Sequence, residues 1–313
     1  MISEDDRLAH ELADQAGQLL LALRAAGGEA GQLRRDGDRR SHEFLAAQLA
    51  AARPGDALLS EEGLDDAARL SADRVWIVDP LDGTREFGEP GRTDWAVHVA
   101  LWERGELTAG AVALPAQGRI LSTAVSGGTV PSGTVPGGTV PGGDVPGGDV
   151  PGGAVPGGAV PGGDVRAAAA SARPGAGPGR LPGAGPSGLP DAEPGPADEL
   201  RFVVSRTRPP EFVQRLAEKV TARLLPLGSA GAKAAAVIGG EADAYVHSGG
   251  QHEWDSAAPV AVARAAGLHT SRIDGSKLVY NQAVPSVPDI LICRAALAGM
   301  LLEAIGYVRH PRE

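Results

Sequence analysis

Asp79 and Asp82 close an apolar strand in the segment WIVDPLDGT. Two carboxylates at a strand end repel one another and are costly to desolvate, so they must be solvated, hydrogen-bonded or bound to cations. The proline between them fixes the turn, and the following Gly83 and Thr84 offer backbone N–H groups and a hydroxyl. The segment therefore predicts a hard divalent metal such as magnesium on one side and a phosphate on the other.

Two more acidic segments lie where a predicted strand or helix ends. Glu61 and Glu62 follow a short strand at 57–60, and Asp255 stands in the segment EWDSAAP at the start of a predicted helix. Taken singly, the glutamates could form a solvated loop and Asp255 could be a helix N-cap. Together with the two aspartates of the first motif they favour a site for more than one metal ion.

The elements that must position these acids fall in two groups. The first half is expected to hold helices over an antiparallel-leaning sheet; its helices are Asp5–Ala26 and Arg40–Ala52, and its strands are 57–60, 75–78, 95–102, 109–114 and 119–124. The second half alternates, which is typical of an α/β layer; its strands are 201–205, 223–227, 242–247 and 289–293, and its helices are 209–222, 230–239, 255–266 and 295–305.

A segment of low complexity separates these halves. Residues 126–199 are rich in Gly, Pro and Ala, and Val130–Asp164 consists of seven elastin-like pentads of the form VPGGx. So much Gly and Pro rules out helix and leaves nothing large to bury, which predicts a disordered insertion. The expected organisation is an N-terminal α+β lobe at residues 1–125, this spacer, and a C-terminal α/β lobe at residues 200–313.

The bulk composition excludes several classes of function. The formal net charge is −10 with no long basic run, so we expect no binding to nucleic acid or to a membrane surface. The single cysteine, Cys293, excludes an internal disulfide framework and lies in an apolar strand as an inert thiol. The sequence contains neither a signal-peptide core nor an apolar run of membrane-spanning length, which predicts a cytoplasmic protein.

The three acidic motifs in this order resemble those of the inositol monophosphatase-like superfamily: an acidic E-E loop, DP(I/L)DGT and WDxAAP. Within it, the segments SRTR at 205–208 and GSAGAK at 228–233 are similar to the CysQ branch, the 3'(2'),5'-bisphosphate nucleotidases, in their actinobacterial form. The resemblance implies the layered α/β/α/β/α sugar-phosphatase fold shared with fructose-1,6-bisphosphatase. It also implies a Mg²⁺-dependent, lithium-sensitive phosphomonoesterase that acts on a small phosphorylated substrate. Relatives are often dimers, so a homodimer is a further expectation.

Site residues follow from the same resemblance. Two or three Mg²⁺ ions would be held by Glu61, Asp79, the carbonyl of Leu81, Asp82 and Asp255. Glu61 and Thr84 would orient and deprotonate the attacking water, with Asp82 as the third catalytic residue, and Gly83 and Thr84 would cradle the scissile phosphate. Further substrate contacts are expected from Ser205, Arg206, Gly228, Ser229, Lys233 and Asp255. Lys233 is expected to meet the 5'-phosphate that is not cleaved, at the start of a helix.

One segment departs from the family pattern. Relatives carry a K-x-D-x-S-P-V-T-x-A-D loop after their first helix, whereas the span 31–38 reads GQLRRDGD. Asp38 matches an acid that in relatives lies near a further metal, so it is a candidate ligand of a third ion. Because the lysine and the SPVT step are missing, the resemblance does not establish whether this chain has the third metal site or the loop.

The predicted reaction is removal of the 3'-phosphate of 3'-phosphoadenosine 5'-phosphate by metal-activated water, giving AMP and phosphate in sulfate assimilation. Inositol-1-monophosphatase and fructose-1,6-bisphosphatase activities are alternatives, because the metal motifs are shared. A non-catalytic scaffold whose working part is the elastin-like arm is another alternative. It predicts that deleting the arm abolishes the biological effect, whereas Asp82→Asn does not.

Overall fold

The computed structural model describes residues 2–124, 129–131, 199–207 and 209–309. Its first half contains helices α1 (Glu4–Ala26), α2 (Ala30–Ala52) and α3 (Thr84–Phe87). These accompany strands β1 (Ala57–Ser60), β2 (Arg74–Asp82), β3 (Ala96–Glu103), β4 (Glu106–Leu114), β5 (Arg119–Ser122) and β6 (Thr129–Pro131). Short 3-10 helices cover Ala67–Ser71 and Pro115–Gln117. The strands form one sheet in the order β1 to β6, parallel between β1 and β2 and antiparallel elsewhere.

The second half forms a five-stranded sheet in the order β10-β11-β9-β7-β8. Its strands are β7 (Leu200–Ser205), β8 (Ala222–Leu227), β9 (Ala244–His252), β10 (His269–Ser271) and β11 (Ser286–Cys293). The helices are α4 (Glu211–Val220), α5 (Ala230–Ile238), α6 (Glu253–Ala265) and α7 (Ala298–Arg309), the last preceded by a 3-10 turn at Ala295–Leu297. β7 runs parallel to β8 and β9, whereas β11 is antiparallel to both of its neighbours. β10 is a strand that the sequence did not predict.

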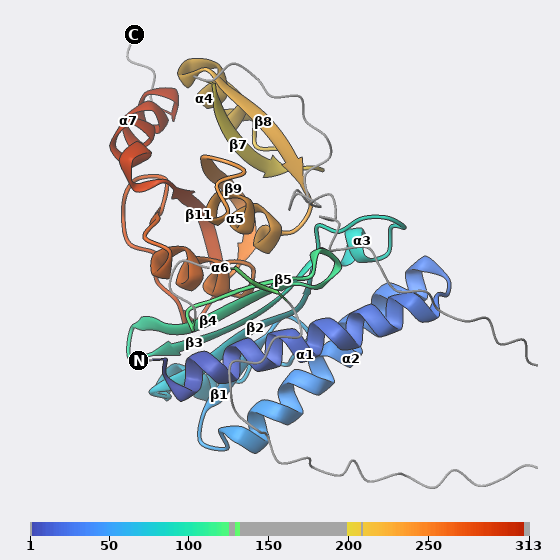
Figure 1. The fold of residues 1–313 in the computed structure, drawn as a ribbon. Helices are drawn as coiled ribbons and strands as arrows, with labels where there is room; N and C mark the ends of the chain where they lie inside the picture. The colour runs from blue at the N-terminus through green and yellow to red at the C-terminus, as the bar shows by residue number, and fades with distance from the viewer. Residues whose placement is uncertain (1, 125–128, 132–198, 208, 310–313) are drawn as a thin grey trace, which may run out of the picture. The chain divides into compact units, whose positions relative to one another are not determined.

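The helices and the two sheets stack in five layers, and three hydrophobic clusters fill the space between them (Figure 1). Alternate residues of β2 point to opposite faces of the first sheet: Trp76 and Val78 pack under α1 and α2, whereas Val75 and Ile77 pack against α5 and α6. The same two helices cover the second sheet, whose other face packs against α4 and α7. The order helix, sheet, helix, sheet, helix confirms the predicted layered α/β/α/β/α fold.

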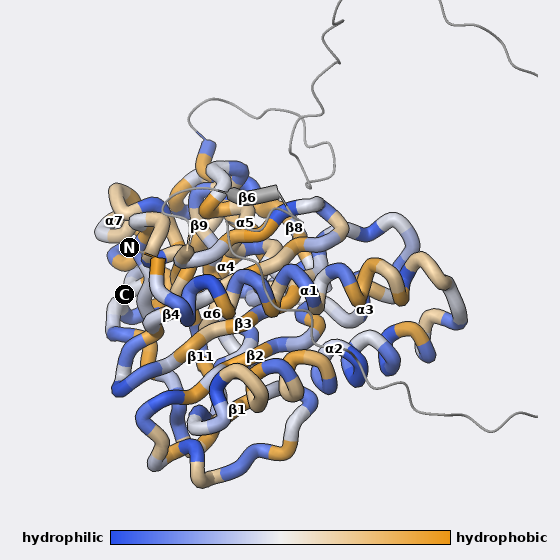
Figure 2. Tube along the Cα trace, turned by 60° about the horizontal axis from the view of Figure 1, so that its bottom comes forward, coloured by the Kyte–Doolittle hydropathy of each residue, from blue (hydrophilic) through white to orange (hydrophobic). Residues whose placement is uncertain are grey.

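Helix α1 is amphipathic, as its sequence predicts. Hydrophobic and hydrophilic residues alternate along it in Figure 2, and its buried members include Leu12 and Leu20. Ser3 caps its first turn, because the side chain accepts a hydrogen bond from the backbone N–H of Asp6. None of the helices in the described part of the chain is long and apolar enough to cross a membrane.

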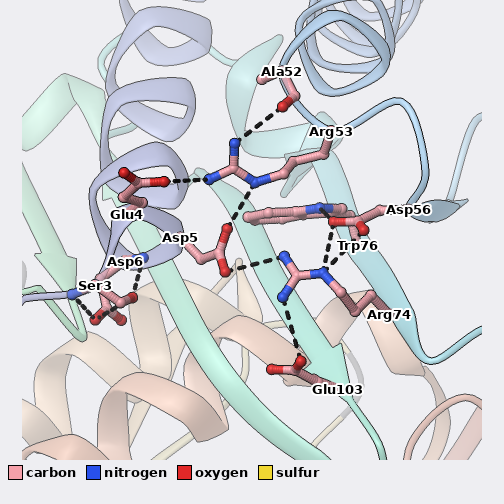
Figure 3. Close-up of polar contacts among 10 residues, drawn as sticks. All are labelled: Ser3, Glu4, Asp5, Asp6, Ala52, Arg53, Asp56, Arg74, Trp76 and Glu103. Carbon is pink, nitrogen blue, oxygen red and sulfur yellow. Dashed lines mark hydrogen bonds and ion pairs between the residues drawn. The ribbon is translucent and has the colours of Figure 1, made fainter.

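Ion pairs attach the start of α1 to the strand that carries the first motif (Figure 3). The carboxylate of Asp5 accepts hydrogen bonds from Arg53, at the end of α2, at 2.9 Å and from Arg74 of β2 at 3.0 Å. Arg74 also donates to Asp56 at 2.9 Å, and the same carboxylate accepts from the indole N–H of Trp76. These contacts hold α1, α2 and β2 in one arrangement at the end of β2 opposite the aspartates.

Helix α2 is where the sequence expectation is wrong. It begins at Ala30 rather than near Arg40, so the span 31–38 is helical and is not the counterpart of a loop. Glu29 caps the helix by accepting from the N–H groups of residues 31 and 32 at 2.7 and 2.8 Å. Gly37, which argues against helix locally, is required by packing, because a Cβ there would lie 2.8 Å from the ring of Phe87.

Most of the predicted insertion lies outside the described residues. Residues 129–131 fall within its expected bounds but form β6, which pairs with β5. Both halves on either side belong to one compact unit made of Met1–Val135 and Ser187–Glu313.

Candidate active site

Three of the predicted metal ligands meet at one point. A ligand oxygen from each of Asp79, Asp82 and Asp255 lies within 4.8 Å of the others, and all three side chains are largely buried. Asp79 and Asp82 end β2, where the register with β3 shifts between them and the backbone turns at the proline. Asp255 is the third residue of α6, and its carboxylate accepts from the N–H of His252 at 2.6 Å. It is therefore not the N-cap, the alternative that the sequence left open.

Glu61 joins this cluster through strand pairing. Ser60 is opposite Val78 in the parallel pair of β1 and β2, which places the next residue beside Asp79. Burial and the negative charges of Asp255 and Asp82 raise the pKa of Glu61 to about 7. Burial and the neighbouring carboxylates also raise the pKa of Asp79 well above its usual range, and that of Asp255 to about 6.

The donor set fits a hard divalent cation. Buried carboxylates crowded at this distance resist ionisation in the protein alone, and the raised pKa values of Glu61, Asp79 and Asp255 are the consequence. A divalent ion would compensate for that repulsion, and oxygen-only ligands suit Mg²⁺ better than softer metals. These residues therefore agree with a metal site, while the identity and number of ions remain predictions.

Asp82 differs from its neighbours because donors surround it. Its Oδ2 accepts from the hydroxyl of Ser229 at 2.5 Å and from the N–H of Gly231 at 2.7 Å, and Nε2 of His98 lies 3.2 Å away. Burial opposes ionisation, but the interactions with His98, Lys233 and Ser229 outweigh it and hold the pKa of Asp82 below its usual range. Sequence reasoning missed His98, although a histidine inside the apolar strand AVHVAL is a recognisable signal.

Thr84 lies between the metal motif and helix α2. Its hydroxyl is 3.1 Å from Oδ1 of Asp38 and 3.1 Å from the carbonyl oxygen of Leu81. Burial raises the pKa of Asp38 to about 6 even though the hydrogen bond from Thr84 opposes that rise. The structure thus brings Asp38 to the site through Thr84, and its predicted role as a third-metal ligand stays untested.

A cavity of about 730 Å³ opens beside the carboxylates, a volume suited to a small ligand. Seven predicted site residues line it: Asp82, Gly83, Thr84, Ser205, Gly228, Lys233 and Asp255. The lining also contains residues that sequence reasoning did not select, among them Arg85, Glu86, Thr207, Tyr245 and Gln251. Arg85 had a usable signal, because it directly follows the DGT of the first motif.

The two predicted cationic contacts have partners inside the protein. Lys233 is 3% exposed, and its ammonium donates to the carbonyl oxygens of Gly228 and Ser229 at 2.7 and 2.8 Å. Burial lowers the pKa of Lys233 although Asp82 favours its charged form. Arg206 donates to Glu86 at 2.6 Å and to Glu89 at 2.9 Å, and is not among the residues that line the cavity.

The GSAGAK turn is fastened to the first half of the chain. Asp94 accepts from the N–H of Gly228 at 2.7 Å through its side chain and from that of Ser229 at 3.2 Å through its carbonyl. A Cβ at Gly228 would lie 2.2 Å from the carboxyl carbon of Glu86. Only glycine fits this approach, so the turn brings the start of α5 against α3 and the residues just before β3.

The sequence and the fold both have close counterparts among known proteins. The 3'-phosphoadenosine 5'-phosphate phosphatase of Mycobacterium tuberculosis is 45% identical over 300 residues, covering 93% of this chain and 89% of that protein. The protein of the same name from Mycobacterium leprae is 43% identical over 314 residues, covering 96% and 93%. The solved inositol monophosphatase II of Staphylococcus aureus shares the fold with a TM-score of 0.64 at 17% identity, covering 97% and 96%. A model of the inositol monophosphatase family matches residues 2–140 and 197–306, so the chain belongs to that family.

Proposed function

We propose that this chain is a Mg²⁺-dependent phosphatase that converts 3'-phosphoadenosine 5'-phosphate and water to AMP and phosphate. The observation that carries the proposal is the identity of 43–45% to mycobacterial phosphatases of that name along almost the whole chain. The carboxylates beside the cavity support it, because Asp82 and Asp255 belong both to the acidic cluster and to the cavity lining.

The metals would be held by Glu61, Asp79, the carbonyl of Leu81, Asp82 and Asp255. When bound, Mg²⁺ supplies Lewis-acid activation of water and neutralises charge on the phosphate. The chain's own part is positioning: the end of β2 supplies two carboxylates, the turn directly after β1 supplies Glu61, and the first turn of α6 supplies Asp255. Each comes from a rigid element, which suits a reaction that depends on alignment.

Proton transfer would use Thr84 and the acids around it. The Thr84 hydroxyl lies 3.1 Å from Asp38, whose pKa of about 6 suits proton exchange near neutral pH. We propose that Thr84, with Glu61, orients the attacking water and passes its proton toward Asp38. The water oxygen bonds to phosphorus, the bond from phosphorus to the 3'-oxygen breaks, and that oxygen takes up a proton. Backbone groups of Gly83 and Thr84 would hold the phosphate during this exchange.

The first experiment compares phosphate release from 3'-phosphoadenosine 5'-phosphate, inositol 1-phosphate and fructose 1,6-bisphosphate, with and without Mg²⁺. We expect kcat/KM to be at least about tenfold higher for the nucleotide, since each added charge-assisted contact contributes about that factor. Activity should disappear when Mg²⁺ is chelated. A preference for either sugar phosphate would contradict the substrate assignment but leave the metal site in place.

Arg85 is a proposed determinant of that preference. It lines the cavity directly after Thr84 and is exposed, and no hydrogen bond or ion pair joins its side chain to another described residue. An available guanidinium in the cavity can bind the phosphate that is not cleaved. Lys233 remains a candidate for the same phosphate, but two carbonyl oxygens already share its ammonium.

Replacing Arg85→Gln is expected to lower kcat/KM for 3'-phosphoadenosine 5'-phosphate by about 10- to 100-fold, the effect of losing one charged hydrogen bond. Hydrolysis of inositol 1-phosphate, which has no second phosphate, should change much less. Arg104→Gln is the matched control, because Arg104 is exposed and its side chain pairs with Asp73 alone among the residues that the structure describes, at 2.8 Å. An equal loss of kcat/KM on both substrates would show that Arg85 does not bind the second phosphate.

A further inference from the structure

We propose that His98 is a positioning residue that locks the two halves of the carboxylate cluster together; this inference rests on the proposed metal-dependent function. His98 lies on β3 and its side chain is fully buried. Its Nδ1 is 3.1 Å from the carbonyl oxygen of Trp254, and its Nε2 is 3.2 Å from Oδ2 of Asp82. One ring therefore links the end of β2 to the residue that precedes Asp255.

The position of His98 in the sheet places it among all three aspartates. In the antiparallel pair of β2 and β3, His98 stands directly opposite Asp79. Its neighbours in the strand, Val97 and Val99, pack toward α1 and α2, so the histidine faces α6 instead.

The contacts of His98 orient the carboxylate of Asp82. A carbonyl oxygen can only accept, so Nδ1 of His98 carries a hydrogen and donates it to Trp254. On the other side, Ser229, Gly231 and His98 all crowd one oxygen of Asp82, Oδ2. Among the described residues, Oδ1 of Asp82 accepts no hydrogen bond, which leaves that oxygen available to a metal. Groups that orient a metal ligand in this way are typically worth 10- to 100-fold in affinity.

The imidazole of His98 lies close against the backbone of α5. A Cβ on Gly231 would lie 2.3 Å from Nε2 of His98, so the backbone of α5 already presses on the imidazole. Nε2 faces Asp82 at 3.2 Å as an ion-pair contact without the alignment of a hydrogen bond. The competing explanation is that His98 only satisfies the Trp254 carbonyl. In that case its loss would lower stability without changing metal affinity.

The test measures Mn²⁺ binding to the full-length, metal-free protein by calorimetry. His98→Leu removes both polar contacts, and we expect its Mn²⁺ affinity to fall about 10- to 100-fold. His98→Gln keeps a donor at the place of Nε2 and should recover part of that loss. In activity assays the Mg²⁺ concentration for half-maximal rate should rise, while kcat at saturating Mg²⁺ changes less.

His10→Leu is the matched control. His10 is also buried and bonds Ser122 through Nδ1 at 3.2 Å, but it lies on α1 away from the carboxylates. It should lower the melting temperature and leave Mn²⁺ affinity unchanged. Wild-type affinity in a folded His98→Leu protein, or the same loss in His10→Leu, would overturn the inference.

Two other outcomes, an unfolded His98→Leu protein and a wild-type protein that binds no Mn²⁺, also decide the question. If His98→Leu does not fold, His98→Gln decides the question, because wild-type Mn²⁺ affinity and Mg²⁺ dependence in that variant would contradict a positioning role. If the wild-type protein itself binds no Mn²⁺, the proposed metal site fails, and the positioning role fails with it.

Discussion

Asp82→Asn is expected to abolish nearly all phosphatase activity, lowering kcat at least about a hundredfold, since losing a group that merely orients a ligand already costs 10- to 100-fold. The substitution removes a negative charge from the point where Asp79, Asp82 and Asp255 meet. It also replaces a carboxylate by a neutral amide. In the wild-type protein that carboxylate accepts hydrogen bonds from the hydroxyl of Ser229 and the N–H of Gly231. The measurement is phosphate release from 3'-phosphoadenosine 5'-phosphate at saturating Mg²⁺.

Asp73→Asn is the control for the same chemical change. Asp73 is 68% exposed in its side chain and, among the described residues, its carboxylate pairs only with Arg104, so the activity of the variant should match that of the wild-type protein. The melting temperature of both variants should be recorded, so that a loss of activity is not confused with a loss of fold. If Asp82→Asn retains more than a tenth of the wild-type kcat, the carboxylate cluster is not the catalytic centre.

Arg69→Met is expected to lower the free energy of unfolding by about 2–4 kcal/mol, because each buried acceptor left without its donor costs about 1–3 kcal/mol. Arg69 is 1% exposed and donates to Asp65 at 2.6 Å, to the side chain of Asn281 at 2.7 Å and to the carbonyl of Gln282 at 2.9 Å. Methionine fills a similar volume but leaves these acceptors without their donor. Urea unfolding, followed by far-UV circular dichroism, measures the change.

The hydrogen-bonded cluster of Arg69, Asp65, Asn281 and Gln282 also connects to the carboxylate site. The N–H groups of Asn281 and Gln282 donate to the buried carboxylate of Glu253 at 2.7 and 2.8 Å, two residues before Asp255. The loop that follows Glu61 is thus tied to the start of α6. Arg104→Met is the control, because an exposed pair contributes no more than about 1 kcal/mol. A loss below that value in Arg69→Met would contradict the role we assign to the cluster.

Local signals in the amino-acid sequence were enough to predict part of this protein. Alternating apolar residues predicted the strands, and Asp79, Asp82 and Asp255 were chosen because each follows or begins a regular element. Carboxylates at such ends are brought together by the fold itself, since strand ends meet at one edge of a sheet. The carboxylate cluster was therefore predictable from short segments and their order, whereas the layered arrangement followed from the resemblance of those segments to the inositol monophosphatase-like superfamily.

The tertiary structure decided everything that depends on contacts between distant segments. Gly37 lies inside α2 because Phe87 packs against it, although glycine locally disfavours helix. Arg206 pairs with two glutamates of the first half, and His98 bonds a carbonyl 156 residues away. A side chain's partners at such separations are fixed by packing rather than by its neighbours in the chain, so residue type and spacing could not reveal them.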